Sequence, residues 1–360
     1  MHPPLPSRQA PPTADVAPSF PILEQRAETT LEDYVAGIVW APDSRQFAVA
    51  GGEGQVFLGN ITASGLSARP IGEHLLGVLD IAWQPKGEHL ATAGQDGTVA
   101  LWNAAGQEAK RWRPAPVTTD RLAFAPGGQL LATASGRHAN VWNAQGELVH
   151  AFPPAAKAIA GLAFDKSGQH LGAASVGEVA VHRIDSHNYQ TRRFLWDAPC
   201  LTVSFSPNGK FLAAGVADGS VHFWYLNSAK DSQMRGYGSR VTWTGFSCNS
   251  RYLGTCAGTD LIIWDFGGKG PEGSKPIQLT GHTDQIECLA WHPDGPYLVS
   301  GGRDWRVSLW CPGKTAQALD AQLAGSEVTA VAWSPDGRQL AVGEKSGQMT
   351  IYQLVLPVRV

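Results

Sequence analysis

Residues 286–310, IECLAWHPDGPYLVSGGRDWRVSLW, contain three apolar runs separated by two short turns. The first run ends at Trp291, and Pro293 and Gly295 follow in the first turn. Proline fixes φ at the first corner of a type I turn, and glycine accepts the left-handed conformation that returns the chain to a strand. The stretch therefore predicts two consecutive β-hairpins, of which the second turns at Asp304-Trp305.

The same unit occurs eight times along the chain, and residues 78–102 (VLDIAWQPKGEHLATAGQDGTVALW) form another clear copy. An anchor aromatic residue ends the first run of each unit, at Trp40, Trp83, Phe124, Phe164, Phe205, Phe246, Trp291 and Trp333. A glycine follows four residues later in six units, at Gly87, Gly128, Gly168, Gly209, Gly295 and Gly337. The anchors are spaced by about 40–45 residues, which is the length of a four-stranded propeller blade.

Residues 22–354 resemble the WD40 family of β-propeller scaffold proteins in this spacing and in a polar pattern. In that family, a His from a Gly-His pair, a Ser or Thr, an Asp and a Trp form a buried hydrogen-bonded tetrad within a blade. The resemblance implies such tetrads at His282, Ser300, Asp304 and Trp310, and at His74, Thr92, Asp96 and Trp102. The tryptophan is replaced by Gly59, His182 and Tyr352 in units one, four and eight, where a tetrad is therefore in doubt.

Eight units predict an all-β, WD40-type propeller of eight blades, each with four antiparallel strands. A seven-bladed ring is the alternative, and it would leave one unit outside the ring. The last unit supplies only three strands, and Pro21–Ala27 resembles the fourth strand of other units. We expect this N-terminal strand to pair into the last blade and close the ring. Residues 1–20 hold six prolines and are expected to be a disordered tail, with residues 21–360 forming one propeller.

Composition narrows the classes of partner. The net charge of −3 and the pI near 6.4 argue against a nucleic-acid-binding protein. The five cysteines include no C-x-x-C pair, which favours reduced thiols over a disulfide framework or a cysteine-based zinc site. The sequence contains neither a membrane-spanning apolar run nor the apolar region of a signal peptide. We therefore expect a cytoplasmic monomer that binds neither membrane nor nucleic acid.

The sequence offers no convincing catalytic motif. It lacks H-E-x-x-H, a phosphate-binding loop, G-x-S-x-G and an EF-hand loop. The run Gly254-Thr255-Cys256-Ala257-Gly258 imitates a nucleophile elbow, but it falls in a second strand, where a buried structural cysteine is expected. His182 and His222 lie on third strands of neighbouring units, and blade-face histidines are favoured there over a metal site. We predict no enzyme activity, no cofactor and no metal.

The WD40 resemblance implies that partners dock on the face that carries the loops leading into each first strand and the second turn of each unit. The matching candidates for contacting a partner are Tyr34, Asp120, Arg240, Glu287, Arg303, Trp305, Glu327 and Lys345. Trp305 is notable because the family usually has a small residue at its position. Aromatic residues and arginine are the residue types most often found at binding hot spots.

These observations favour a non-catalytic scaffold or adaptor that binds other proteins. The alternative is a propeller enzyme, or a protein that binds a metal or small molecule in the central channel. A nucleic-acid-associated factor is a third hypothesis, against which the acidic net charge argues. Because one fold serves many functions, the partner itself does not follow from the sequence.

Overall fold

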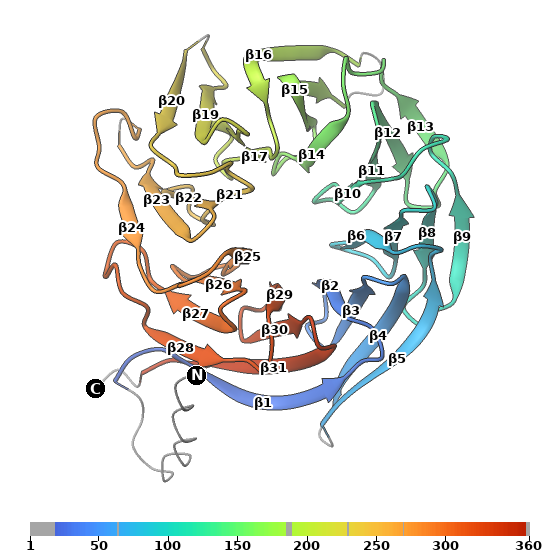
Figure 1. The fold of residues 1–360 in the computed structure, drawn as a ribbon. Helices are drawn as coiled ribbons and strands as arrows, with labels where there is room; N and C mark the ends of the chain where they lie inside the picture. Colours follow the sequence, from blue (N-terminus) through green and yellow to red (C-terminus); the bar gives the residue numbers. More distant parts are fainter. Residues whose placement is uncertain (1–18, 63–64, 185–188, 229, 269, 358–360) are drawn as a thin grey trace, which may run out of the picture.

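The computed structural model describes residues 19–62, 65–184, 189–228, 230–268 and 270–357. Every regular element in these residues is a β-strand, and the strands form eight sheets arranged around one axis (Figure 1). The prediction of an eight-bladed β-propeller is confirmed, and no unit lies outside the ring. The predicted tail falls largely outside the described residues, which begin at Ser19.

Each blade is an antiparallel sheet, and in all blades but the last its strands follow one another outward from the ring axis in chain order. Blade 1 contains β2 (Val35–Trp40), β3 (Gln46–Gly51), β4 (Gln55–Thr62) and β5 (Gly65–Glu73), and blade 2 contains β6 (Val78–Trp83), β7 (Leu90–Gly94), β8 (Val99–Trp102) and β9 (Glu108–Trp112). Blade 3 contains β10 (Arg121–Phe124), β11 (Leu130–Ser135), β12 (His138–Asn143) and β13 (Leu148–Ala151). Blade 4 contains β14 (Ile159–Phe164), β15 (His170–Arg183) and β16 (Thr191–Pro199).

The second half of the chain continues the ring. Blade 5 contains β17 (Ser204–Phe205), β18 (Phe211–Gly215), β19 (Ser220–Tyr225) and β20 (Asp231–Arg235), and blade 6 contains β21 (Trp243–Phe246), β22 (Tyr252–Ala257), β23 (Asp260–Asp265) and β24 (Ile277–Leu279). Blade 7 contains β25 (Ile286–Trp291), β26 (Leu298–Gly302), β27 (Arg306–Trp310) and β28 (Asp320–Leu323). Blade 8 contains β29 (Val328–Trp333), β30 (Gln339–Glu344), β31 (Gln348–Val355) and, from the start of the chain, β1 (Ile22–Thr30).

In blade 4, the single strand β15 takes two strand positions. Its first half pairs with β14 and its second half pairs with β16. The reversal occurs at Gly177, whose φ is 90°, and the N–H of Ile184 donates to the carbonyl of Gln169 at 2.7 Å. The hairpin is so tight that β15 is continuous through the turn.

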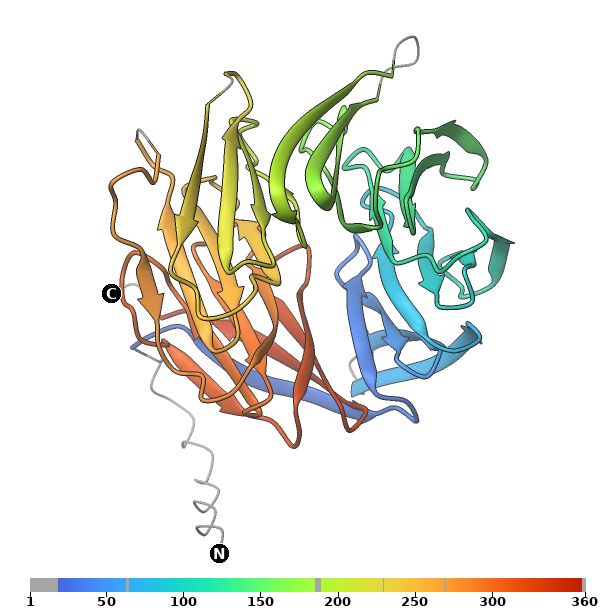
Figure 2. The ribbon, with the colours of Figure 1, turned by 45° about the horizontal axis from the view of Figure 1, so that its top comes forward.

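The ring closes through β1, as predicted. This strand lies along the outer edge of β31, and the pairing runs from Ile22–Val355 to Thr30–Gln348 (Figures 1 and 2). Leu23 is 2% exposed, and its N–H donates to Asp320 Oδ2 of blade 7 at 2.7 Å. The strand extends to Thr30, three residues beyond the expected segment, so that both ends of the chain build blade 8.

The second strand of each blade lies within the core. Every residue of β7, β18 and β26 is buried. A strand covered on both faces by neighbouring blades needs apolar or small residues on both faces, which explains runs such as Leu-Ala-Thr-Ala-Gly. The outer strands combine exposed and partly buried residues because one face meets solvent.

The first turns confirm the left-handed glycine in four blades. Residues at this position with φ between 58° and 76° are Ser44, Gly128, Gly168, Gly209, Ser250 and Gly337. The prediction was wrong for Gly87 and Gly295, whose φ values lie outside this region. In those two turns the residue after the anchor is Gln84 or His292 instead of a smaller residue, and His292 Nδ1 accepts the N–H of Gly295 at 2.7 Å. These longer side chains cap the turn in a different backbone conformation.

The anchor tryptophans tie neighbouring blades together. Trp40 Nε1 donates to the carbonyl of Ala332 at 2.9 Å, Trp291 Nε1 to Gly245 at 2.8 Å, and Trp333 Nε1 to Ala290 at 3.2 Å. Each acceptor lies on the first strand of the preceding blade. Phenylalanine anchors cannot make this bond, and the buried Trp83 Nε1 of blade 2 has no hydrogen-bond partner among the described residues, so this kind of tie is concentrated at the joints from blade 6 through blade 8 to blade 1.

Asp80 links blades 2 and 3, and its ionisation makes the stability of the protein depend on pH. Its Oδ2 accepts the N–H of Leu122 at 2.7 Å, yet burial raises the pKa of Asp80 to about 6. An acid whose folded pKa is raised binds its proton more tightly in the folded state, so the ionised form costs stability above pH 6 and this cost disappears as the pH falls towards 4.

We therefore expect Asp80→Asn to be more stable than the wild type by about 1–2 kcal/mol at pH 7.5, with the difference vanishing near pH 4. Urea unfolding of both proteins at a series of pH values measures this difference. Parallel stability profiles for the two proteins would contradict the role assigned to Asp80.

Within the described residues there is no helix long and apolar enough to cross a membrane.

Candidate functional site

The four residues implied as a tetrad in blade 7 lie together. His282 Nε2 is 2.7 Å from Ser300 Oγ, and Trp310 Nε1 donates to the same oxygen at 2.8 Å. His282 Nδ1 lies 3.0 Å from Asp304. Ser300 and Trp310 are fully buried, so this hydroxyl satisfies two polar groups that water does not reach.

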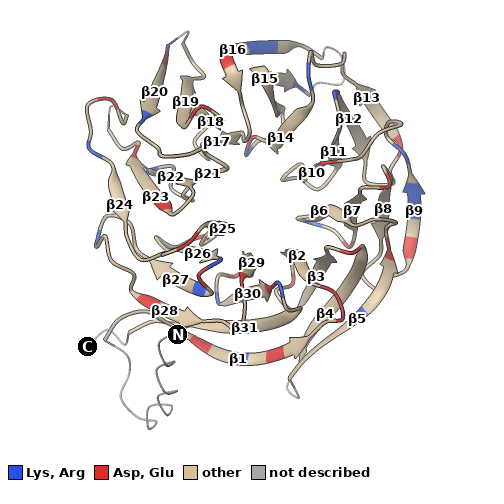
Figure 3. Cartoon of the chain, viewed as in Figure 1, with Lys and Arg blue, Asp and Glu red and all other residues tan. Residues whose placement is uncertain are grey.

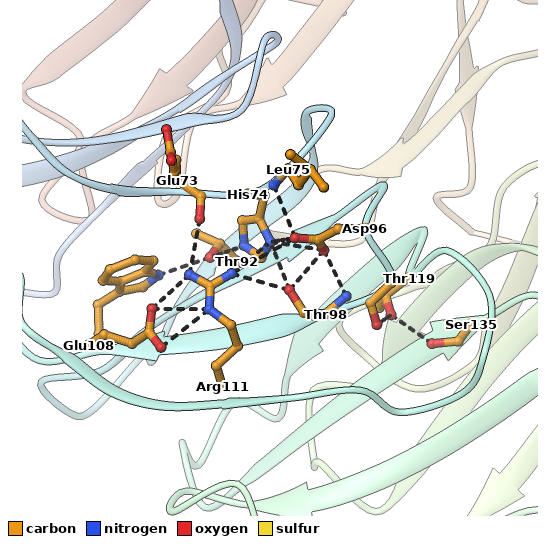
Figure 4. A network of polar contacts seen from close by, with 12 residues as sticks. Glu73, His74, Leu75, Thr92, Asp96, Thr98, Glu108, Arg111, Thr119 and Ser135 are labelled. Atoms are coloured by element: carbon orange, nitrogen blue, oxygen red, sulfur yellow. Dashed lines mark hydrogen bonds and ion pairs between the residues drawn. The ribbon is translucent and has the colours of Figure 1, made fainter.

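Blade 2 repeats the arrangement and extends it (Figure 4). Thr92 Oγ1 lies 2.8 Å from His74 Nε2 and accepts Trp102 Nε1 at 2.9 Å, while His74 Nδ1 is 3.3 Å from Asp96. Burial lowers the pKa of His74, which keeps the ring neutral. Burial alone would raise the pKa of Asp96, but the hydrogen bonds from Thr98 and His74 lower it. The blade thus holds a neutral imidazole against a carboxylate.

Each tetrad fixes the loop that leads into the first strand, here called the lead-in loop, against the second turn. The carboxylate of Asp96 accepts the N–H of Leu75 at 3.1 Å, and that of Asp304 accepts the N–H of Thr283 at 2.9 Å. Lead-in loops and second turns therefore lie on one face of the ring, which we call the loop face. The tetrads hold this face rigid.

Blade 6 contains a third network that the sequence analysis missed. Tyr237 takes the position of the histidine: its hydroxyl is 2.6 Å from Thr255 Oγ1 and accepts Trp264 Nε1 at 2.7 Å. Burial raises the pKa of Tyr237 to about 12, so the hydroxyl remains protonated. The sequence signal for this network was the pair Gly236-Tyr237. Tyr237 stands nine residues before the anchor Phe246, just as His74 and His282 stand nine residues before the anchors of their own units.

Four of the residues expected to contact a partner come together across blades 7 and 8. Arg303 forms an ion pair with Glu287, and Lys345 Nζ lies 3.1 Å from Glu327. The hydrogen bond to Glu287, with a smaller contribution from Glu327, raises the pKa of Arg303. The surface of these two blades is therefore mixed in sign.

The other candidates are spread around the loop face. Tyr34 is on the lead-in loop of blade 1 and is 42% exposed. Asp120 precedes the first strand of blade 3 and accepts the Thr118 hydroxyl at 3.1 Å, and Arg240 is exposed on the lead-in loop of blade 6. The structure does not gather these three with the group on blades 7 and 8.

Trp305 occupies a backbone position that disfavours it. Its φ is 64°, and the equivalent positions in blades 2 and 5 are glycines, Gly97 and Gly219, with φ of 78° and 76°. A bulky residue in the left-handed region costs about 1–2 kcal/mol relative to glycine. The indole is nevertheless 45% exposed. Strained backbone of this kind is often found at functional positions.

The groups that could support chemistry have structural surroundings. Cys256 is 1% exposed, and burial raises its pKa to about 12, so the thiol stays protonated. His182 Nδ1 lies 2.8 Å from Thr191 Oγ1, and His222 Nε2 lies 2.8 Å from Asp231, so each histidine has its own partner. The part of the chain that the structure describes contains no group of three or more potential metal ligands.

Comparison with known proteins identifies the repeat. The family model described as "WD domain, G-beta repeat" matches at four places, residues 68–103, 192–225, 273–311 and 313–353. The chain therefore contains WD40 repeats. The four matched repeats of this WD40 protein include both blades that carry a full His-containing tetrad.

One curated protein and one solved structure are similar to this WD40 protein. The anaphase-promoting complex subunit cdh1 of Dictyostelium discoideum is 28% identical over 153 residues, which cover 38% of this chain and 20% of that protein. The match thus spans about a fifth of the relative's length. Among solved structures, the C-terminal WD40 domain of Sif2 has a TM-score of 0.75 at 14% identity, covering 92% of this chain and 98% of that domain. At this identity the likeness shows the fold alone.

Proposed function

We propose that this WD40 protein is a non-catalytic scaffold, acting as a cytoplasmic monomer, that docks other proteins on its loop face. The observation that carries the proposal is Trp305, an exposed indole held in a left-handed turn where the equivalent turns use glycine. A residue that costs backbone stability and leaves nearly half of its surface exposed has no evident role in folding. Exposed aromatic residues beside arginine are typical of binding hot spots.

Two further features support the proposal. The tetrads fix the backbone beneath the loop face, which reduces the entropy lost when a partner binds. The relative from Dictyostelium discoideum is by its name a subunit of a multiprotein complex. Neither feature suggests a reaction, a nucleic acid or a membrane as the target.

Two variants test the proposal by affinity capture from the native cell. Trp305→Gly removes the indole and suits the observed φ, so we expect it to raise the unfolding temperature slightly while it weakens capture by about tenfold or more. Arg303→Glu places a second acid beside Glu287 and should also weaken capture. Because the first variant is more stable than the wild type, its loss of binding cannot be attributed to misfolding.

The matched control combines Arg338→Glu, on an exposed first turn at the opposite face, with Leu195→Ala, on the outer strand β16. This control should retain the captured protein. If no protein is captured, or if all variants retain it, the scaffold proposal fails at this surface. A stoichiometric small ligand or metal found by native mass spectrometry would then favour the channel-binding alternative.

A further inference from the structure

A second, separate group of exposed apolar side chains lies on the loop face over blades 1 to 3. It consists of Tyr34, Leu75, Leu76 and Val117, which are 42%, 72%, 67% and 44% exposed. All four belong to the lead-in loops of three consecutive blades. We call this group the apolar ridge. Figure 4 shows Leu75, whose N–H joins the polar network through Asp96 while its side chain points away from it.

The structure places these loops side by side. The ring of Tyr34 covers Gly52, and a Cβ added to Gly77 would lie 2.7 Å from the Gly52 carbonyl oxygen. Towards blade 3, a Cβ on Gly97 would lie 2.5 Å from the Val117 carbonyl oxygen. The second turns beside the ridge contain Gly52 and Gly97, which have no side chain to cover it.

Leu76 is strained as well as exposed. Its φ is 78°, a conformation that a leucine adopts at a cost of about 1–2 kcal/mol. The residue seven positions before the anchor is polar in most other blades, at Asp33, Lys157, Ser239, Asp284 and Ser326. Two adjacent exposed leucines, one of them strained, therefore distinguish blade 2 from its neighbours.

Acidic side chains border the ridge on the side of blades 1 and 2. Glu32 and Glu73 each stand two residues before a ridge residue, and Glu53 follows Gly52. All three are exposed, and within the described ranges none forms an ion pair. On the side of blade 3, Arg113 and Arg137 are exposed, and Arg113 approaches Gly97. Figure 3 shows acidic and basic segments interspersed around the ring.

We propose that the apolar ridge binds a peptide segment of a partner protein in which one or two large apolar side chains are followed by lysine or arginine. The apolar side chains cover Leu75, Leu76 and Val117, and the basic residues face Glu32, Glu53 and Glu73. The arginines of blade 3 set the direction of the segment, because its acidic or neutral end lies there. This inference rests on the proposed scaffold function and adds a second site with a defined ligand chemistry.

The charges favour a basic peptide over a membrane. Insertion of exposed leucines into a lipid surface is usually supported by basic residues that attract anionic headgroups. Here the exposed carboxylates Glu32, Glu53 and Glu73 outnumber the nearby cation Arg111, which contacts the Glu73 carbonyl and is paired with Glu108, and anionic lipids are repelled by such an excess of acids. A second copy of this chain would have to present basic apolar loops to the ridge, and the loop face carries acids at the corresponding positions.

A peptide display library selected on the full-length protein tests the inference. We expect the enriched sequences to share one or two large apolar residues with Lys or Arg on one side. The best sequence, labelled with fluorescein, is then measured by fluorescence anisotropy. Leu75→Ser with Leu76→Ser should weaken its binding at least tenfold, while Trp305→Gly should leave it unchanged.

Charge and salt provide an independent readout. Glu32→Lys with Glu73→Lys should weaken binding of the labelled peptide several-fold, and the wild-type affinity should fall with added salt. The apolar variants should retain that salt dependence. Thermal unfolding of each variant shows whether it is folded, and Leu76→Ser should not be less stable than the wild type, since the leucine is exposed.

Several outcomes would overturn the inference. These are an enriched sequence without basic residues, binding that survives both leucine substitutions, and a dimer that dissociates only in the leucine variant. Stronger binding to vesicles of phosphatidylcholine and phosphatidylserine than to any peptide would also overturn it. If the leucine variant still captures the cellular partner while Trp305→Gly does not, the scaffold function stands and the ridge proposal alone fails.

Discussion

Replacing Thr92 with valine is expected to lower the free energy of unfolding by roughly 2–4 kcal/mol. The substitution keeps the shape of the side chain and removes one oxygen atom. That oxygen lies 2.8 Å from His74 Nε2 and accepts Trp102 Nε1 at 2.9 Å, in a place where Thr92 is fully buried. Its loss leaves two buried polar groups without partners.

Two controls isolate the hydroxyl. Thr92→Ser keeps the oxygen and loses a buried methyl, so it should cost about 1 kcal/mol. Blades 1 and 8 naturally carry Val49 and Val342 at the equivalent position, and neither has a histidine or tryptophan to satisfy. A urea-unfolding comparison in which the valine and serine variants lose equal stability would refute the account of the tetrad.

Removal of residues 1–30 is expected to have the largest effect of any change considered, on the order of 5 kcal/mol. The deletion removes β1, whose Leu23 is almost fully buried, and exposes the hydrogen-bonding edge of β31. An uncovered strand edge promotes association between molecules. We expect a lower and broader thermal transition and concentration-dependent aggregation, measured by calorimetry and light scattering.

A synthetic peptide of residues 19–31 should restore part of the lost stability, because the strand closes the ring without a covalent link. Within the intact chain, Leu23→Ser should cost about 3 kcal/mol, while Arg26→Ser, on the same strand but half-exposed, should cost less than about 0.5 kcal/mol. A truncated protein that unfolds like the intact one would contradict the closure assigned to β1.

The fold was predictable because its local chemistry repeats. The anchors from Trp40 to Trp333 mark each first strand, and the turns after them combine residues with a defined backbone role. Both His-containing tetrads could be predicted because units two and seven each carry the His, Ser or Thr, Asp and Trp that the WD40 resemblance implies. The details that depend on neighbours were not visible, such as the caps by Gln84 and His292 that change the conformation of Gly87 and Gly295.

The loop face was harder to predict because its details also depend on neighbouring residues and blades. Tyr237 was missed because a phenol replaces the expected imidazole, although its hydroxyl also links the threonine and the tryptophan of its blade. Leu75, Leu76 and Val117 were missed because apolar residues in loops are common, and their exposure is visible only in the assembled ring. The bonds from Trp40 and Trp291 to preceding blades also require the assembled ring.

The shared blade has a consequence for how the protein is made. Since β1 ends at Thr30 and its partner β31 begins at Gln348, the ribosome must add more than 300 residues between them. At about 5–20 residues per second, the first strand waits roughly 15–65 s for its neighbour. During that interval the nascent chain presents an unpaired N-terminal strand to the crowded cell. Ring closure is therefore a late event of biosynthesis, and slow translation lengthens the period in which chaperones can bind that strand.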